Sequence, residues 1–236
     1  MLDLIRKTLL KHQKSRWIKM SATWDEGSLG LTSVVEALVD KVNCNAESLI
    51  VDLGSGSGQL SIPLAKRSKT VYAVDISPPM LDQLVAKAKK EGVENIKPVA
   101  GSIEEMKFDK SSIDFVVTNY ALHHLLDLDK QLIAKQIFEW LKPGGTLIIG
   151  DMMFGRGSDQ RDREIIKGKL LALVKRGPGG WFRIIKNVFR YSLRFSERPV
   201  PIETWLNNLK NAGFENIDYQ KIVAEAVIMT ASKPKQ

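Results

Sequence analysis

The stretch that decides the fold is Val51-Asp52-Leu53-Gly54-Ser55-Gly56-Ser57-Gly58. Apolar residues 49–51 lead into it and a helix-like run, residues 59–65, follows it, so the pattern predicts a strand, a glycine turn and a helix. Glycines at alternate positions let the chain turn tightly, and they remove the Cβ atoms that would keep a ligand at a distance. A helix that begins behind such a turn presents free N–H groups. We therefore expect a nucleotide-like cofactor at the carboxyl end of this strand.

The glycine spacing excludes two common nucleotide-binding motifs. The dinucleotide fingerprint G-x-G-x-x-G would need a glycine where the chain has Gln59, and the phosphate loop G-x-x-x-x-G-K-[ST] is absent. An acidic residue, Asp52, stands two positions before the first glycine. The pattern resembles motif I of the class I S-adenosylmethionine (SAM) methyltransferases, which implies SAM as the cofactor and S-adenosyl-L-homocysteine as the product. The resemblance places Asp52, Gly54, Gly56 and Gly58 at the cofactor.

The second predicted strand, residues 70–75, ends in a carboxylate, Asp75. An acid at this place can accept two hydrogen bonds from a ribose diol, so we expect Asp75 to bind the cofactor. The alternative is a structural role, because Asp75 or Ser77 could cap the helix that begins near Pro78. By resemblance, Ile76 also belongs to the cofactor site.

A short strand, residues 96–100, leads to the turn Gly101-Ser102-Ile103-Glu104. The methyltransferase family usually has an acid at the position of Ser102, where it meets the adenine amino group, and Ile103 would pack on the adenine ring. A serine hydroxyl can accept the same hydrogen bond but carries no charge. Glu104 or Glu105 could compensate, or both could lie in a solvated helical turn.

The fourth predicted strand, residues 112–120, ends in Asn119-Tyr120, where substrates meet cofactors in this architecture. By resemblance, Asn119 belongs to the cofactor site. Amino-group DNA and RNA methyltransferases have [DN]-P-P-[YF] here, whereas this chain continues with Ala121-Leu122, which disfavours that chemistry. A cytosine-C5 enzyme needs a Pro-Cys nucleophile, and Cys44 is in the wrong place.

Two adjacent histidines, His123 and His124, follow this strand. No H-x-x-x-H or Cys/His set accompanies them, so no metal site is expected. The run resembles the "LHH" of small-molecule and quinone-type methyltransferases. A neutral hydroxyl or carbon nucleophile would need a base, and the candidates are Tyr120, His123, His124 and Asp151. The alternative for each histidine is ordinary packing.

A second family mark is the run Leu141-Lys142-Pro143-Gly144-Gly145-Thr146-Leu147. It ends a helix predicted at 128–141 and starts a strand at 146–151. The ordered set of marks covers about residues 45–151. Alternation of strands and helices predicts an α/β fold: a Rossmann-like, doubly wound, mostly parallel sheet of seven strands, with a C-terminal antiparallel hairpin at 214–220 and 225–231.

We expect a single domain, residues 1–236, with two additions. Residues 1–28 are interpreted as an N-terminal helix and lid: residues 1–20 form a basic amphipathic helix that packs on the domain or contacts a membrane surface. By resemblance, Trp24 closes over the cofactor. Residues 152–200 are interpreted as a helical cap insert over the substrate side.

The net charge of +8 is concentrated in this cap, because residues 156–198 contain twelve Lys or Arg and four Asp or Glu. A turn at 176–180 divides the cap into two apolar helical stripes. The second has a basic residue at every fourth position: Lys186, Arg190, Arg194 and Arg198. These side chains could face an acidic substrate, a membrane surface, nucleic acid or solvent.

The composition is that of an ordinary globular protein. Of the 236 residues 44% are hydrophobic, which is enough for a sizeable core, and the single cysteine excludes an internal disulfide. No apolar run approaches the roughly 20 residues that span a bilayer, and the N-terminus lacks a signal-peptide core. We expect a cytoplasmic protein.

These features predict a SAM-dependent methyltransferase that acts by in-line displacement on an O, N or C nucleophile of a small molecule. Aromatic and methionine side chains of the cap favour an apolar or aromatic acceptor: Met152, Met153, Phe154, Trp181 and Phe182. Methylation of RNA or protein, guided by the basic cap, is the alternative. A non-catalytic SAM-binding module and an NAD-dependent oxidoreductase are further hypotheses, and Gln59 argues against the second. The oligomeric state and the acceptor atom stay open.

Overall fold

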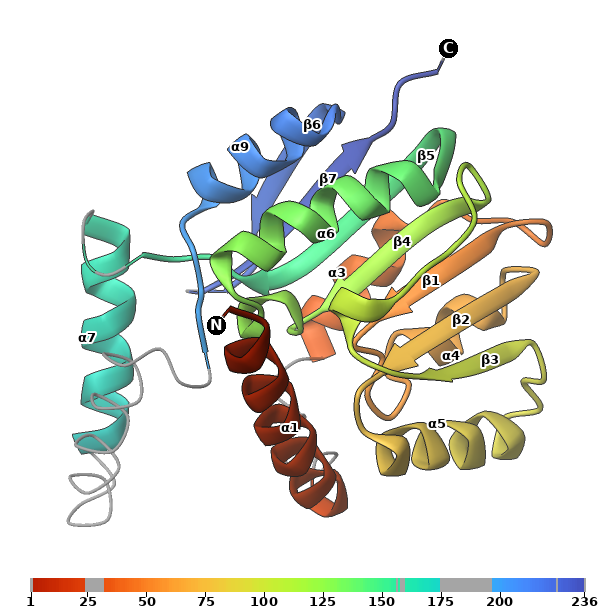
Figure 1. The fold of residues 1–236 in the computed structure, drawn as a ribbon, viewed down its shortest axis with the longest axis horizontal. Coiled ribbons are helices and arrows are strands. Elements are labelled where there is room, and N and C mark those ends of the chain that lie inside the picture. Colours follow the sequence, from red (N-terminus) through yellow and green to blue (C-terminus); the bar gives the residue numbers. More distant parts are fainter. Residues whose placement is uncertain are drawn as a thin grey trace.

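A seven-stranded sheet forms the centre of the molecule (Figure 1). In the computed structural model its strands are β1 (Leu49–Leu53), β2 (Thr70–Asp75), β3 (Ile96–Ala100), β4 (Ile113–Asn119), β5 (Leu141–Met152), β6 (Glu215–Lys221) and β7 (Ala226–Ser232). The strand order is β3-β2-β1-β4-β5-β7-β6. Strands β1 to β5 are parallel, and β7 is antiparallel to both of its neighbours. The predicted doubly wound sheet with a C-terminal antiparallel hairpin is confirmed.

The structure describes residues 2–23, 32–155, 157, 160–174, 197–223 and 225–235. The helices in these ranges are α1 (Leu2–Met20), α3 (Thr32–Lys41), α4 (Ser61–Ala65), α5 (Pro78–Lys90), α6 (Asp127–Trp140), α7 (Gln160–Val174) and α9 (Ile202–Ala212). Single 3₁₀ turns occur at η1 (Ser21–Thr23), η3 (Ile103–Glu105) and η4 (Leu122–His124). None of the described helices combines the length and the apolar character needed to cross a membrane.

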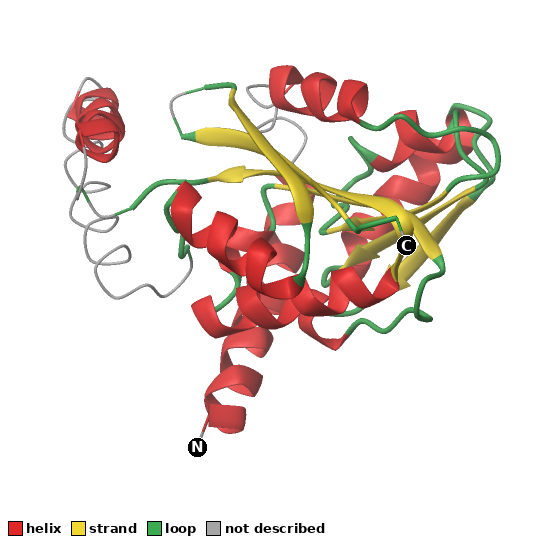
Figure 2. Ribbon diagram, turned by 90° about the horizontal axis from the view of Figure 1, so that it is seen from above, coloured by secondary structure: helices red, strands yellow, loops and turns green. Residues whose placement is uncertain are grey.

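Alternate side chains of the central strands point to opposite faces of the sheet and fill two cores. On β1, Val51 and Leu53 pack in the core beneath α6 and α9, whereas Ile50 packs on the other side with residues of α3, α4 and α5. Figure 2 shows the helices on both faces of the sheet. Because the central strands are buried on both faces, they are nearly continuous apolar runs in the sequence.

Strand β5 begins earlier than the sequence predicts, at Leu141 rather than at Thr146. Its pairing with β4 shifts from Ile113 opposite Leu141 to Phe115 opposite Thr146, so the intervening residues form a bulge. Gly144 has a φ of 79° in this bulge, which a residue with a Cβ resists. The helix stop was therefore placed correctly, but pairing with β4 starts immediately after it.

The helix behind the glycine turn is shorter than predicted. Helix α4 has five residues, Ser61–Ala65, and the chain then turns at Lys66-Arg67-Ser68 toward β2. A helix of this length has little macrodipole. The ligand-facing groups at this place must therefore come from the turn itself and from neighbouring strands.

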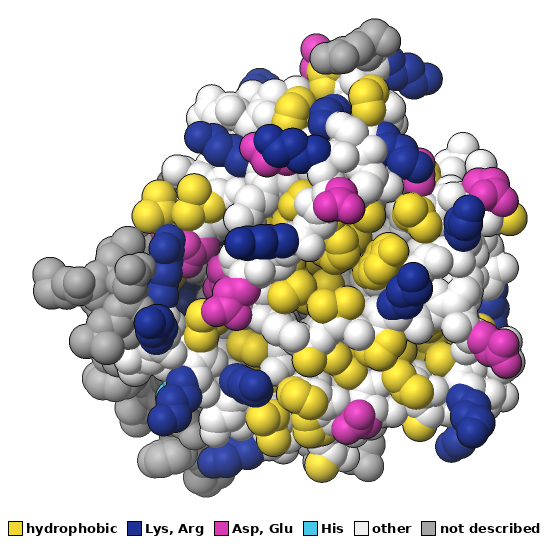
Figure 3. Space-filling view, turned by 45° about the vertical axis from the view of Figure 1, so that its right-hand side comes forward, with side chains coloured by type: hydrophobic (Ala, Val, Ile, Leu, Met, Phe, Trp, Pro, Cys, Tyr) yellow, Lys and Arg dark blue, Asp and Glu magenta, His cyan; other side chains and the backbone are white. Residues whose placement is uncertain are grey.

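The connection from β3 to β4 contains η3 and no longer helix. Aromatic side chains cover this part of the sheet: the Phe108 ring lies edge-to-face against Tyr72 and Trp140, at centroid distances of 5.6 and 5.1 Å. Figure 3 shows hydrophobic side chains near the middle of one face of the molecule, with Lys and Arg side chains spread around them.

Helix α1 lies beside the carboxyl ends of the parallel strands, whereas α7 stands apart from the sheet (Figures 1 and 2). The predicted N-terminal helix is thus present, and it lies at the end of the sheet where a ligand is expected. The predicted division into a domain, a lid and a cap stays a prediction, because Trp24 and much of 152–200 lie outside the described residues.

Candidate cofactor site

The glycine turn after β1 is tied to the end of β2. The backbone N–H groups of Gly54 and Ser55 both donate to the carbonyl of Val74, at 2.8 and 2.9 Å. The Gly56 N–H donates to Asp75 Oδ2 at 2.9 Å. The other oxygen, Oδ1, accepts from the Ser77 N–H at 2.8 Å. Asp75 therefore lies at the glycine turn, as the sequence predicts, and it also orders the start of α5.

Gly54 allows a close approach of two segments that are distant in the sequence. A Cβ on Gly54 would lie 2.4 Å from the Cβ of Ala121, and the residue has a φ of 78°. At Gly58 a Cβ would lie 2.9 Å from the Leu84 side chain of α5 instead. Gly54 is thus required at the cavity wall, whereas Gly58 is required for packing against α5 and does not line the cavity.

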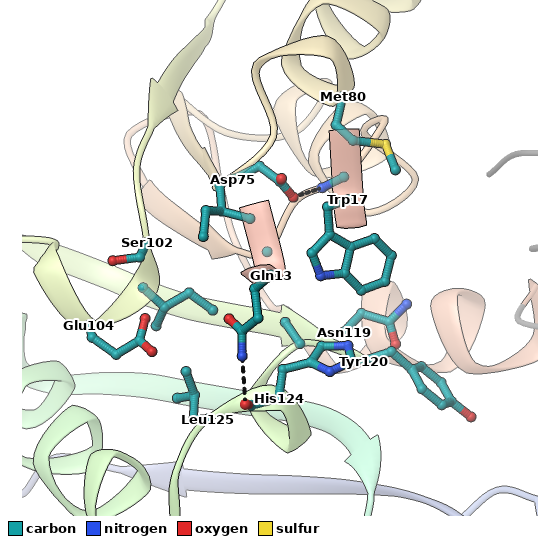
Figure 4. Close-up of a pocket in the computed structure, with 15 residues that line it drawn as sticks. Gln13, Trp17, Asp75, Met80, Ser102, Glu104, Asn119, Tyr120, His124 and Leu125 are labelled. Carbon is teal, nitrogen blue, oxygen red and sulfur yellow. Dashed lines mark hydrogen bonds between the residues drawn. The ribbon is translucent and has the colours of Figure 1, made fainter. Parts of the chain in front are cut away.

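The main cavity has a volume of about 650 Å³, including its open mouth. Nine residues that the sequence predicts for the site line it: Gly54, Gly56, Asp75, Ile76, Ser102, Ile103, Asn119, Tyr120 and His124. A second cavity of about 370 Å³ continues past Asp52, Ser55 and Ser57 and shares Gly54, Gly56, Asn119 and Tyr120 with the first. The carboxyl ends of β1, β2 and β4 therefore meet at one continuous site (Figure 4).

Buried carboxyl groups give this site its electrostatic character. Burial raises the pKa of Asp52 to about 7. The Ser61 hydroxyl donates a hydrogen bond to Asp52 Oδ2 at 2.6 Å and lowers this pKa, whereas the nearby carboxylate of Asp75 raises it further. Burial also raises the pKa of Asp75, against the two N–H groups that bind it. A cation bound here would stabilise the ionised carboxylates. The site is therefore suited to a positively charged ligand.

Two buried polar atoms at the site have no hydrogen-bond partner among the described residues. They are Ser55 Oγ and Asn119 Oδ1, and both side chains line the second cavity. A buried acceptor or hydroxyl without a partner costs free energy, on the order of 1–3 kcal/mol. A ligand with hydrogen-bond donors would satisfy Asn119 Oδ1, so these atoms mark where the polar end of a ligand fits.

Tyr120 directly follows β4 and lies in the left-handed region, with a φ of 50°, and its N–H donates to the Gly150 carbonyl at 2.8 Å. Burial raises the pKa of its phenol, and Glu225 and Asp151 add to the increase. The phenol therefore stays protonated at neutral pH, where it can donate a hydrogen bond but cannot accept a proton as a base. Its ring packs against an apolar group at the start of the cap, formed by Met152, Phe154 and Ile165.

His123 is buried and paired with Asp151. Its Nδ1 lies 2.6 Å from Asp151 Oδ1, while Asp151 Oδ2 accepts from the His123 N–H at 2.9 Å and Oδ1 from the Met152 N–H at 2.7 Å. A carboxylate only accepts, so the proton of a neutral imidazole resides on Nδ1 and the lone pair on Nε2. His123 does not line the main cavity, but its ring lies 3.9 Å from that of His124, which does.

Helix α1 supplies two residues of the cavity wall that the sequence analysis does not identify, Gln13 and Trp17. Gln13 Nε2 donates to the His124 carbonyl at 3.0 Å, and the Trp17 ring lies edge-to-face on the His124 ring at 5.2 Å. Their four-residue spacing puts both on one face of the helix. Trp24, which the resemblance places over the cofactor, lies outside the described residues.

The turn after β3 differs from the expectation of a solvated glutamate pair. Glu104 lines the main cavity, and burial raises its pKa. Glu105 is exposed, and one of its oxygens accepts the Ser102 hydroxyl at 2.8 Å. The predicted cofactor residue Ser102 therefore lines the cavity with its hydroxyl already bonded to a neighbour.

The basic stripe predicted in the cap needs one correction. Arg198 is buried rather than exposed: its N–H donates to the His123 carbonyl and its Nη1 to the His124 carbonyl, at 2.6 and 3.2 Å. It therefore fixes η4 from the back. The other members of the stripe and the two aromatic residues of the cap lie outside the described residues: Lys186, Arg190, Arg194, Trp181 and Phe182.

Among the described residues, no group of three or more His, Cys, Asp or Glu side chains is arranged to hold a metal ion.

Known proteins resemble this chain in sequence. A family profile described as a methyltransferase domain matches residues 50–145. An uncharacterized methyltransferase of Geobacillus sp. strain WCH70 is 27% identical over 154 residues, which are 65% of this chain and 68% of the relative. Phosphoethanolamine N-methyltransferase 1 of Triticum aestivum is 28% identical over 165 residues, 64% of this chain and 32% of the relative. The chain spans 44% to 62% of the length of four further uncharacterized methyltransferases.

Solved structures show the same fold. The YcgJ protein of Bacillus subtilis, in a crystal structure at 16% identity, superposes with a TM-score of 0.62 over 86% of this chain and 98% of its own. A complex of DhpI with SAH, at 15% identity, has a TM-score of 0.69 over 97% of this chain and 98% of its own. At such low identity the likeness concerns the arrangement of the backbone and not the ligand or the reaction.

Proposed function

We propose that this chain is a class I methyltransferase that transfers the methyl group of SAM to a small-molecule acceptor and releases S-adenosylhomocysteine. The observation that carries the proposal is the position of Asp75, whose carboxylate lies at the glycine turn and lines the main cavity. A carboxylate there can accept hydrogen bonds from a ribose diol.

The charge and the hydrogen-bonding groups of the site fit SAM. Its sulfonium and ammonium groups are positive, and the site has carboxyl groups whose pKa values burial raises, Asp52 and Asp75. The ammonium group offers donors for Asn119 Oδ1, which has no partner among the described residues. Asp52 and Asn119 would therefore hold the amino-acid end, Asp75 the ribose, and Ile76 and Ile103 the apolar faces of the base.

Bound SAM supplies a methyl group that is already electrophilic, so the protein mainly has to align the acceptor and exclude water. Trp17 and Gln13 of α1 shield the cavity from solvent on one side. The Tyr120 phenol can donate a hydrogen bond to the acceptor. His123, held by Asp151 with the lone pair on Nε2, can take a proton from a hydroxyl acceptor that reaches it.

Apolar side chains of the main cavity favour an apolar or aromatic acceptor. Trp17, Tyr120 and Leu125 line this cavity. Behind the Tyr120 ring, Met152, Phe154 and Ile165 form a buried apolar cluster against which it packs. An apolar cavity wall stabilises a nonpolar molecule by burial. Association with RNA remains the alternative for the basic cap, and it would weaken steeply with salt.

Calorimetry with SAM and with S-adenosylhomocysteine tests the cofactor. We expect both to bind the wild-type protein and to bind the Asp75→Ala variant much more weakly. Radiolabelled SAM incubated with metabolite fractions at low and high salt then tests the acceptor, and label should enter a small molecule at both salt concentrations. Failure of both ligands to bind the wild-type protein would refute the proposal.

A further inference from the structure

Ser102 occupies the position after β3 where the family resemblance predicts a contact to the adenine amino group. Its hydroxyl donates to Glu105 Oε2 at 2.8 Å, and the residue is 4% exposed. In Figure 4 the Ser102 side chain points away from the middle of the cavity. The hydroxyl is thus engaged in holding the turn, and it is badly oriented to bind a ligand.

Glu104, two residues further on, has the opposite orientation. Its carboxyl group points into the cavity in Figure 4, on the side of Leu125 and His124. It also lines a smaller cavity of about 310 Å³ between α1 and α6. No other described side chain donates a hydrogen bond to this carboxyl, whose pKa is raised by burial and by the neighbouring Asp129 and Glu105, against its own backbone N–H and Arg6. A carboxyl group has more acceptor sites than its own backbone N–H uses, so Glu104 can still accept hydrogen bonds from a ligand.

The spacing between the neighbouring strands β2 and β3 sets how far a nucleoside bound at Asp75 has to reach. Asp75 and Ala100 are opposite each other on the neighbouring strands β2 and β3, and strands in a sheet are about 4.8 Å apart. A ribose held at Asp75 can therefore place its base over the turn that follows β3. Ile76 and Ile103 offer apolar contacts on the way, and Glu104 lies beyond them at the cavity wall.

We infer that Glu104, and not Ser102, recognises the exocyclic amino group of the cofactor's adenine. This inference rests on the proposed function. A carboxyl oxygen of Glu104 accepts a hydrogen bond from the amino N–H. A glutamine side chain keeps an acceptor oxygen at this place, whereas alanine removes it.

Calorimetric titration with S-adenosylhomocysteine distinguishes the two residues. We expect Glu104→Ala to weaken binding roughly 10- to 100-fold, as the loss of a buried hydrogen bond to a charged group does, and Glu104→Gln to stay within a few fold of wild type. Ser102→Ala and the matched control Glu105→Gln should also stay within a few fold. Thermal unfolding of each variant checks that it is folded.

A ligand change provides a second measurement on the wild-type protein and does not depend on the alanine variant. S-Inosylhomocysteine has a carbonyl oxygen in place of the amino group. We expect it to bind wild type more weakly than S-adenosylhomocysteine, and we expect the two ligands to differ much less in Glu104→Ala, because the residue that distinguishes them is gone.

The outcomes separate this inference from the proposed function. If wild type binds neither SAM nor S-adenosylhomocysteine, both fail. If wild type binds S-adenosylhomocysteine while Glu104→Ala binds it equally well, or if Ser102→Ala alone loses binding, the role of Glu104 is refuted and the proposed function stands. Equal binding of the inosyl and adenosyl ligands by wild type refutes it as well.

Discussion

The backbone N–H of Gly56 donates a hydrogen bond to Asp75 Oδ2 at 2.9 Å, which joins the glycine turn after β1 to the end of β2. The two residues are nineteen positions apart. The same carboxylate accepts from the Ser77 N–H and lines the main cavity. The Asp75 side chain thus orders both the glycine turn and the start of α5, and it faces the main cavity.

Replacing Asp75 should therefore weaken SAM binding strongly and lower the free energy of unfolding less. We expect Asp75→Ala to weaken SAM binding by at least tenfold, because the ribose contact and the ordered turn are lost together. Calorimetry measures the effect. The matched control is Asp82→Ala, an exposed aspartate on α5, which should bind SAM as wild type does. Equal binding by the two variants would contradict the role of Asp75.

Two glycines with similar backbone angles differ in their surroundings and form a matched pair. Gly54 has a φ of 78° and Gly92 a φ of 69°, but a Cβ would lie 2.4 Å from Ala121 Cβ at Gly54 and within 4 Å of nothing at Gly92. We expect Gly92→Ala to cost about 1–2 kcal/mol of unfolding free energy from the left-handed backbone alone. Gly54→Ala should cost clearly more and should also abolish SAM binding. Urea unfolding of both variants tests this. If both lose the same free energy of unfolding, the segment around Ala121 moves away from the added methyl group at no cost.

The raised pKa of Asp52 predicts how stability depends on pH. The folded-state pKa of about 7 lies above the ordinary value of 3.8, so between about pH 4 and 7 the folded chain binds more protons than the unfolded chain. The free energy of unfolding should therefore fall as the pH rises through this window. In Asp52→Asn the fall should be smaller but not absent, since the pKa values of Asp75 and Glu104 are also raised.

Urea unfolding at a series of pH values measures this dependence, with the exposed Asp82→Asn as the control. Asp52→Asn should be the more stable protein at pH 8. In the wild type, affinity for the cationic SAM should increase from pH 6 to pH 8, because the bound cation favours the ionised carboxylate. A pH profile of Asp52→Asn that matches wild type would contradict the shifted pKa.

Helix α1 is fastened to the domain by an ion pair between Arg6 and the buried Asp129. Arg6→Ala would leave the Asp129 carboxylate buried without this cation, so we expect α1 to detach more often. Amide hydrogen exchange should become roughly tenfold or more faster in α1 and stay unchanged in β1 and β4. SAM affinity should fall as well, because Gln13 and Trp17 line the cavity. As a control, replacing the neighbouring, exposed Lys7 by alanine should change neither the exchange rate nor the SAM affinity. If the amides of α1 stay protected in Arg6→Ala, other contacts are enough to hold the helix on the domain.

The pair of His123 and Asp151 predicts a defined imidazole tautomer. Nitrogen-15 NMR of the ring should show Nδ1 protonated in His123, and the signal of this proton should be lost in Asp151→Asn. The exposed His12 on α1 serves as the internal reference. With an acceptor that carries a hydroxyl, Asp151→Asn should lower kcat roughly 100-fold. A His123 ring protonated on Nε2 would remove the argument for its role as a base.

Features that depend on local chemistry could be predicted from the sequence. The turn at residues 54–58 follows from glycine at alternate positions, and the sheet follows from the alternation of apolar strands with helices. Asp75 could be identified because a strand end fixes where its side chain emerges. The early start of β5 could not, because pairing of Leu141 with Ile113 depends on another strand.

The residues that line the cavity are harder to predict from the sequence. Gln13 and Trp17 belong to a basic N-terminal helix whose sequence does not point to a ligand, and only the docking of α1 on His124 places them at the cavity. Arg198 fits a regular basic stripe in the sequence, yet it is buried against η4, since its N–H and guanidinium groups find carbonyl acceptors there.

By itself, the sequence determined the succession of strands and helices along the chain, the glycine turn and the acid at the end of β2, because each is set by residue preferences over a few neighbouring positions. Only the tertiary structure decided which carboxyl groups face the cavity, which histidine is held by a carboxylate and which helix covers the opening. The reason is physical: burial, pKa and hydrogen-bond partners are properties of the space around a side chain, and segments far away along the chain fill that space.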